Sequence, residues 1–168
     1  MKPSPSAIAA AIVFTAAVMG HAPQARASLS LATAAASCQA SRHSHEAGLR
    51  KRPLGFRNDG TSSVFISCGL QWGYFMYQSP SAFVVATNLT ERQVELSCTL
   101  VDGWPLPGEV AYYTRTVSLP PFAFASVEWV PSELYGGASL SNYENVSCNV
   151  PPGVEINLVG YQYTQPDP

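Results

Sequence analysis

The chain has 168 residues, of which 46% are hydrophobic and 12% are charged. This composition excludes an intrinsically disordered chain, and the length suits one domain with a substantial core. The formal net charge is only −2, so the basic surface that binds nucleic acid is not expected here.

The first 27 residues have the pattern of a secretory signal peptide. Lys2 supplies a positive start, residues 7–19 form an apolar run, and Ala25–Ala27 has the small-x-small form of a signal-peptidase site. The run is too short to span a bilayer but fits a cleaved leader. We therefore expect residues 1–27 to be a cleavable helical signal peptide. The mature protein is expected to be secreted or periplasmic, without a transmembrane span.

Residues 28–57 are predicted to form an Ala-rich and basic arm that is largely irregular. This segment has five basic residues and one acidic residue, whereas residues 58–168 have two basic and ten acidic residues. The arm can lie against the acidic remainder by charge attraction, or it can contact an anionic surface such as lipid headgroups or envelope polysaccharide. Nucleic acid is not an expected partner, because the acidic remainder repels phosphate.

A β-sandwich domain is predicted over residues 58–168, after the turn signal at Asn58–Gly60. About seven short runs show alternating or β-branched and aromatic patterns, separated by Gly and Pro. We therefore predict an all-β chain with an antiparallel sandwich, Ig-like or jelly-roll-like. The predicted strands are Val64–Leu70, Ala82–Asn88, Val94–Leu100, Val110–Leu119, Ala125–Val130, Ala138–Val150 and Glu155–Thr164.

Four cysteines in an exported chain indicate two disulfides. Three pairings are open, and we favour Cys38–Cys68 with Cys98–Cys148. Cys98 and Cys148 each share a strand face with apolar neighbours, so both thiols are predicted to point into the core. No two cysteines are closer than thirty residues, which disfavours a structural zinc site.

Three segments resemble small exported bacterial four-cysteine β-sandwich proteins of unassigned function. They are Asn58–Cys68 (NDGTSSVFISC), Leu96–Gly103 (LSCTLVDG) and Asn145–Gly153 (NVSCNVPPG). The resemblance covers roughly residues 38–163 and rests on turns, strands and cysteines. It implies the fold and the exported compartment, and it supplies no catalytic residues.

Two groups of residues are predicted as contact surfaces. One is the run of three bases in the arm, and the other is an aromatic segment whose rings suit stacking on sugars or partner side chains. The alternative for the aromatic segment is that its rings fill the core. The residues are Arg50, Lys51, Arg52, Trp72, Tyr74 and Tyr77.

The sequence gives only weak support for a metal site or a catalytic site. His43 and His45 would project on one side of an extended segment and could chelate a divalent cation, with Glu46 as a third ligand. An exposed polar loop is the simpler interpretation, and no metal or cofactor is predicted. Known catalytic motifs are absent from the sequence, so no enzyme is predicted. Paired carboxylates remain an alternative if they meet in space: Glu91, Glu95, Asp102, Glu109 and Glu128.

The expected function is a non-enzymatic binding or structural module of the cell envelope or extracellular space. Envelope polysaccharide or another exported protein are the candidate partners. The first alternative is a carbohydrate-binding module that uses exposed aromatics, and the second is a small secreted hydrolase that uses carboxylates. The glycosylation-type matches at Asn88 and Asn145 are treated as chance, because the leader and the resemblance indicate a bacterial route.

Overall fold

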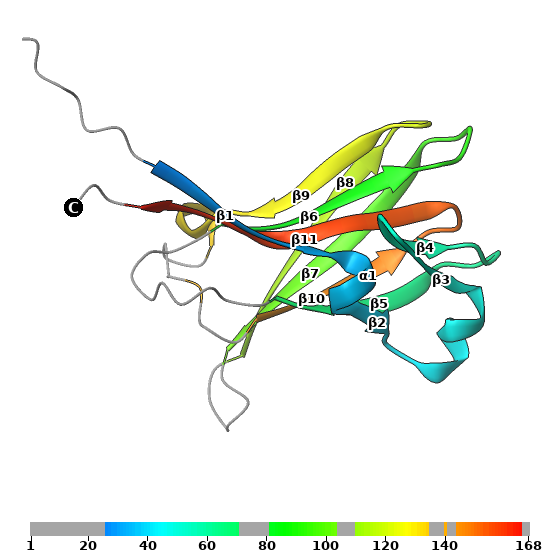
Figure 1. Cartoon of the computed structure of the whole chain (residues 1–168), viewed down its shortest axis with the longest axis horizontal. Helices are drawn as coiled ribbons and strands as arrows, with labels where there is room; N and C mark the ends of the chain where they lie inside the picture. Colours follow the sequence, from blue (N-terminus) through cyan, green and yellow to red (C-terminus); the bar gives the residue numbers. More distant parts are fainter. Residues whose placement is uncertain (1–25, 71–80, 104–109, 135–139, 141–143, 166–168) are drawn as a thin grey trace, which may run out of the picture.

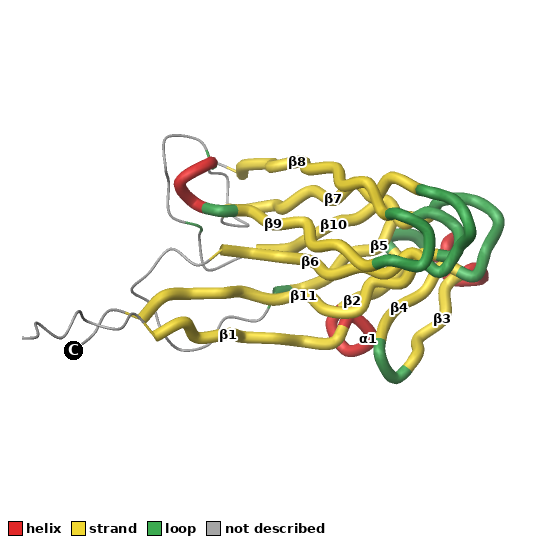
Figure 2. The backbone as a smooth tube through the Cα atoms, turned by 90° about the horizontal axis from the view of Figure 1, so that it is seen from above, coloured by secondary structure: helices red, strands yellow, loops and turns green. Residues whose placement is uncertain are grey.

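The protein is an antiparallel β-sandwich. The computed structural model describes residues 26–70, 81–103, 110–134, 140 and 144–165. Two sheets pack as layers (Figure 1). The strand axes of the two sheets are roughly aligned with each other (Figure 2). This arrangement confirms the prediction of an all-β chain.

Sheet A contains six of the described strands, and each pairs antiparallel with its neighbours. Its spatial order is β3 (Leu49–Arg52), β4 (Gly55–Asn58), β11 (Val154–Gln165), β6 (Ser81–Asn88) and β9 (Phe124–Trp129), with β1 (Arg26–Thr33) paired to β11 beyond β4.

Sheet B contains five of the described strands, also antiparallel. Its order is β2 (Cys38–Ala40), β5 (Val64–Gly69), β10 (Glu144–Val150), β7 (Val94–Gly103) and β8 (Val110–Leu119). Three short helical segments connect strands: α1 (Ala34–Ser37), η1 (His43–Gly48) and η2 (Pro131–Glu133).

The core lies between the sheets because apolar side chains alternate along the strands. Each strand turns every second residue inward, so burial alternates along β6 and β10. Trp129 is fully buried, and its indole Nε1 donates a hydrogen bond to the carbonyl oxygen of Tyr113 at 2.6 Å. That bond ties the edge strand of sheet A to the edge strand of sheet B. Among the described residues, no helix is long and apolar enough to cross a membrane.

Both disulfides lie inside sheet B and face the core. Cys38 is bonded to Cys68 and Cys98 to Cys148, with Cα atoms 4.0 Å apart in each pair. In each pair the two residues are directly opposite on neighbouring strands, β2 with β5 and β7 with β10. The favoured pairing is therefore confirmed, and it cross-links four of the five strands of sheet B.

The segment expected to be an irregular arm is largely built into the sheets. Residues 28–57 contribute most of β1 and β4, with all of β2 and β3, so the described chain has eleven strands rather than about seven. Strands β2, β3 and β4 have only three or four residues each, too few to show a period in the sequence. Their order comes from distant partners: the Cys38 disulfide fixes β2, and Leu49 and Phe56 are buried in the core. Residues 1–25 of the expected signal peptide lie outside the described residues.

Two arches with the same construction connect the sheets at one end of the sandwich. In each, a strand of sheet A ends at a fully buried asparagine and the chain then enters sheet B, β4 to β5 at Asn58 and β6 to β7 at Asn88. The Asn58 Oδ1 accepts from the N–H of Gly60, and the Asn88 Oδ1 accepts from the N–H of Thr90, each at 2.9 Å. These bonds form Asx turns, which begin the two arches in the same way.

The amide nitrogens of the same asparagines hold the return connections. Asn58 Nδ2 donates to the carbonyl oxygen of Val150 at 2.9 Å, where β10 ends. Asn88 Nδ2 donates to the carbonyl oxygen of Leu119 at 3.0 Å, where β8 ends. Asn58 therefore links the β4–β5 connection to the β10–β11 connection, and Asn88 links the β6–β7 connection to the β8–β9 connection. A glycan on Asn88 is incompatible with this fold, because the nitrogen is buried and already donates hydrogen bonds.

Replacing Asn88 with alanine is expected to lower the free energy of unfolding by about 3 kcal/mol, because buried carbonyl and amide groups lose their partners. Asn58→Ala is expected to cost a similar amount. Asn145→Ala is the matched control, since Asn145 is exposed on β10, and its effect is expected to stay within about 0.5 kcal/mol. Urea unfolding of the three variants checks this. Equal midpoints for Asn88→Ala and Asn145→Ala would show that the buried amides are dispensable.

Candidate functional site

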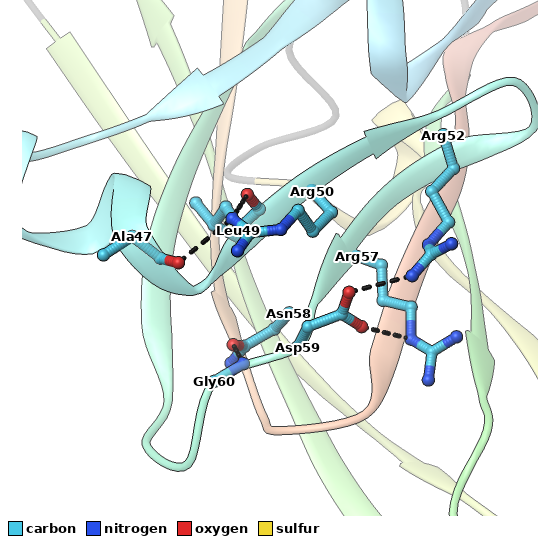
Figure 3. A network of polar contacts seen from close by, with 8 residues as sticks. All are labelled: Ala47, Leu49, Arg50, Arg52, Arg57, Asn58, Asp59 and Gly60. Carbon is cyan, nitrogen blue, oxygen red and sulfur yellow. Dashed lines mark hydrogen bonds and ion pairs between the residues drawn. The ribbon is translucent and has the colours of Figure 1, made fainter.

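The basic run predicted as a contact surface lies on an exposed hairpin. We call β3, β4 and their turn the basic hairpin (residues 49–58). Arg50, Lys51 and Arg52 are all exposed on its outer strand. Figure 3 shows how the arginines are held: Arg50 Nη1 donates to the carbonyl oxygens of Ala47 and Leu49, both at 3.1 Å.

Asp59 pairs with two of the arginines of the basic hairpin. Its carboxylate lies 2.9 Å from Arg52 Nη2 and 2.7 Å from Arg57 Nε, as Figure 3 shows. The contact with Arg52 is also a hydrogen bond. These pairs are partly exposed, so each contributes no more than about 1 kcal/mol to stability. Two of the arginines are thus engaged by an acid of the same chain, which weakens the hairpin as a site for an external anion.

The aromatic segment predicted as the second contact surface gains no structural support. Trp72, Tyr74 and Tyr77 lie outside the described residues, so their position stays a prediction.

The two histidines do not share one side of an extended strand. They lie in η1, a 3-10 segment with three residues per turn, so residues two apart point in different directions. His43 Nδ1 lies 3.0 Å from Glu46 Oε2, whereas His45 Nδ1 accepts from the N–H of Phe65 at 3.3 Å. Among the described residues, no group of three or more His, Cys, Asp or Glu side chains is placed to hold a metal ion.

One carboxyl pair forms in the interior. Asp102 lies directly opposite Glu144 across β7 and β10, and both are buried. Glu95 and Glu128 are exposed on different sheets, Glu91 is exposed in an arch, and Glu109 lies outside the described residues. Asp102 of the predicted acidic set therefore has a carboxyl neighbour among the described residues, and that neighbour, Glu144, is not a member of the set.

Glu144 differs from an ordinary surface acid because its carboxyl is buried. Burial raises the pKa of Glu144 to about 8, the Tyr161 hydroxyl opposes this shift, and the charge of Asp102 adds to it. Glu144 is therefore protonated at neutral pH, in the interior rather than in an open cleft.

The outer face of sheet B is a broad surface with little charge. On β5, β10 and β7 the outward side chains alternate with buried ones, and on β8 exposed side chains alternate with half-buried ones. The central row of directly paired residues carries hydroxyl and amide groups only. It runs across β2, β5, β10, β7 and β8 as Gln39, Ser67, Ser147, Thr99 and Thr114.

The two flanking rows continue the same chemistry and add two aromatic rings. One row consists of Phe65, Asn149, Ser97 and Thr116, and the other of Gly69, Asn145, Val101 and Tyr112. We call these three rows the hydroxyl face. Every residue of the hydroxyl face is uncharged. The nearest outward charge on the described strands is Glu95, beyond Ser97 on β7.

Hydroxyl groups on this face bond to one another and to the sheet. Thr99 and Thr114 hydroxyls are 2.8 Å apart, and the Thr116 hydroxyl donates to that of Ser97 at 3.2 Å. The Ser147 hydroxyl donates to the carbonyl oxygen of Ile66 at 3.2 Å. A hydroxyl has one donor and two acceptor sites, so these side chains are fixed in place and keep acceptor capacity toward solvent.

The outer face of sheet A is different. One row of directly paired residues on sheet A contains both charges and an exposed ring. It runs across β3, β4, β11, β6 and β9 as Arg50, Arg57, Glu155, Thr87 and Phe124. Asn157 Nδ2 donates to Glu155 Oε1 at 3.0 Å, and the Thr87 hydroxyl donates to Asn157 Oδ1 at 2.7 Å. The uncharged character is therefore a property of the hydroxyl face and not of the whole sandwich surface.

The sequence contained a signal for the hydroxyl face. The outward positions of the predicted strands could be read from the same alternation that identified the inward ones, and three strands have two or more Ser, Thr or Asn residues at these positions. The order of strands in the sheet was not predictable, and that order is what aligns these residues into rows.

In comparisons with known proteins, no protein-family model matches the chain and no curated protein matches it. The assignment of a function therefore rests on the geometry.

Proposed function

We propose that the protein is an exported, non-enzymatic binding module of the cell envelope or extracellular space, and that the hydroxyl face is its contact surface. A bacterial origin, secretion through the N-terminal signal peptide and an Ig-like or jelly-roll-like sandwich belong to the same proposal. The resemblance to small exported four-cysteine proteins supports it.

The disulfides support the compartment. Two buried bridges indicate an oxidising, extracellular-type environment, because thiols in reducing compartments stay unpaired. In the described part of the chain every cysteine is in a disulfide. A small domain that is cross-linked in this way suits exposure to conditions outside the cytoplasm.

The observation that carries the proposed role is the uncharged hydroxyl face. An ordinary solvated surface carries dispersed charges of both signs for solubility, as the outer face of sheet A does. A face of five strands without one charged residue in its three rows is unusual by that standard. Exposed Phe65 and Tyr112, at 49% and 68% exposure, add apolar area suited to contact.

The hydrolase alternative has weaker support. Its best residues are Asp102 and Glu144, which are 9% and 6% exposed and turned toward the interior. Hydrolysis of a polymer requires two carboxyl groups that flank an accessible bond. The pair in this protein has no such access within the described residues, so we do not favour this function.

Binding to an envelope fraction tests the proposal. The oxidised protein is expected to bind saturably at low salt and to stay bound at high salt, because the hydroxyl face uses no charge and the Debye length falls to about 3 Å at 1 M salt. Thr114→Glu, which places a charge on the hydroxyl face, is expected to reduce binding at least tenfold. Ser126→Glu is the matched control, since Ser126 is exposed on the edge strand of sheet A.

Two results contradict the proposal. One is the absence of saturable binding to any envelope fraction. The other is an equal loss of binding in Thr114→Glu and Ser126→Glu, which would place the contact elsewhere. Loss of binding at high salt with normal behaviour of Thr114→Glu would instead assign the contact to the basic hairpin.

A further inference from the structure

We infer that the hydroxyl face binds a neutral polysaccharide chain, laid across the strands of sheet B. This inference rests on the proposed function and names the class of ligand that the face recognises.

The chemistry of the face matches that of a neutral glycan. Such a chain presents many hydroxyl groups, each a donor and an acceptor, and carries no charge. The central row offers hydroxyl and amide partners on five successive strands, so hydrogen bonds can repeat along a repeating ligand. Buried charge without a partner is costly, and the face has none to desolvate.

The two exposed rings lie at opposite corners of the face. Phe65 is on β5 in one flanking row, and Tyr112 is on β8 in the other. Three strand spacings and four residues along a strand separate these positions, which gives about 20 Å from sheet geometry. Ser147 and Thr99, in the central row, lie between them. A chain that spans several sugar rings can therefore stack at both corners and hydrogen-bond in the middle.

The same features disfavour other occupants. A protein partner, including a second copy of this chain, is expected to need an apolar and aromatic centre in its interface, whereas the centre of this face is polar. An anionic polymer is expected to need basic residues, and the three rows of the hydroxyl face contain none. The neutral glycan is the occupant whose chemistry the face complements.

Affinity electrophoresis of the oxidised protein tests the inference. Native gels contain a soluble β-1,4-glucan, a β-1,3-glucan, a galactomannan or, as the anionic probe, polygalacturonate. At least one neutral polymer is expected to retard the protein, and retardation is expected to persist in salt. Tyr112→Ala is expected to weaken that binding about three- to tenfold, the range for one aromatic contact.

Phe124→Ala is the matched control, because Phe124 is 76% exposed on the edge strand of the other sheet. Its binding is expected to stay within twofold of the wild type. A second variant, Thr99→Ala with Thr114→Ala, removes one hydroxyl pair of the central row without adding bulk. It is expected to weaken binding while the unfolding midpoint stays near that of the wild type.

Three results would overturn the inference. The first is that no neutral polymer retards the protein, and the second is that Tyr112→Ala and Phe124→Ala behave alike. The third is self-association that Tyr112→Ala abolishes without any glycan binding, which would make a second copy the occupant. If envelope binding still depends on Thr114 while every neutral polymer fails, the ligand class is wrong and the proposed contact surface stands.

Discussion

Replacing Glu144 with glutamine is expected to stabilise the protein at about pH 8 and to change little at about pH 5. Burial raises the pKa of the Glu144 carboxyl to about 8 from its ordinary value of 4.5. Between these values the unfolded chain releases the proton while the folded chain keeps it. Stability therefore falls as the pH rises through this window. Glutamine does not titrate, so the variant lacks this loss.

The gain at pH 8 is expected to approach about 4 kcal/mol, because each pKa unit corresponds to about 1.4 kcal/mol. Urea unfolding of wild type and Glu144→Gln at several pH values between about 5 and 8 measures it. Glu95→Gln is the matched control, since Glu95 is exposed on β7, and it should follow the wild type. A difference between wild type and Glu144→Gln that is the same at every pH would show that Glu144 is not held neutral.

Removing the bridge between Cys98 and Cys148 is expected to cost about 4 kcal/mol. The bridge closes a separation of 50 residues, and the chain-entropy model gives a loss of this size for such a loop. It also holds β7 to β10, the two central neighbours in sheet B. Thermal or urea unfolding of Cys98→Ala with Cys148→Ala, under oxidising conditions, measures the change.

The other disulfide provides the comparison. Cys38 and Cys68 are separated by 30 residues and join the short edge strand β2 to β5. Removing both with alanine is expected to cost somewhat less, because β2 can fray while the other strands keep their partners. If the variant without the central bridge unfolds at the wild-type midpoint, the scaffold does not depend on oxidised sulfur.

Much of the sandwich could be predicted from the alternation of apolar and polar residues along each strand. Each of the seven predicted strands corresponds to one of β5 to β11, and the described part of the sixth is Glu144–Val150. The cysteine pairing was also predictable, because Cys98 and Cys148 share inward faces with apolar neighbours. Local patterns were sufficient wherever a strand has one buried and one solvated face.

Features that depend on distant partners were not predicted. Strands β2, β3 and β4 have three or four residues each, which is too short for a periodic signal. Asn58 and Asn88, and likewise Cys68 and Cys98, are thirty residues apart, and this spacing is the signal that would have shown the two equivalent arches. Glu144 was missed because its carboxyl neighbour Asp102 comes from a different strand.

Carbene footprinting of the envelope-bound, oxidised protein tests the central claim most directly, namely that the hydroxyl face is the contact surface. Labelling is read residue by residue by mass spectrometry, with and without the envelope fraction. Phe65 and Tyr112 are expected to lose label on binding, while the exposed rings of Phe122 and Phe124 keep theirs. Protection of Phe122 and Phe124 with unchanged labelling of Phe65 and Tyr112 would contradict the account.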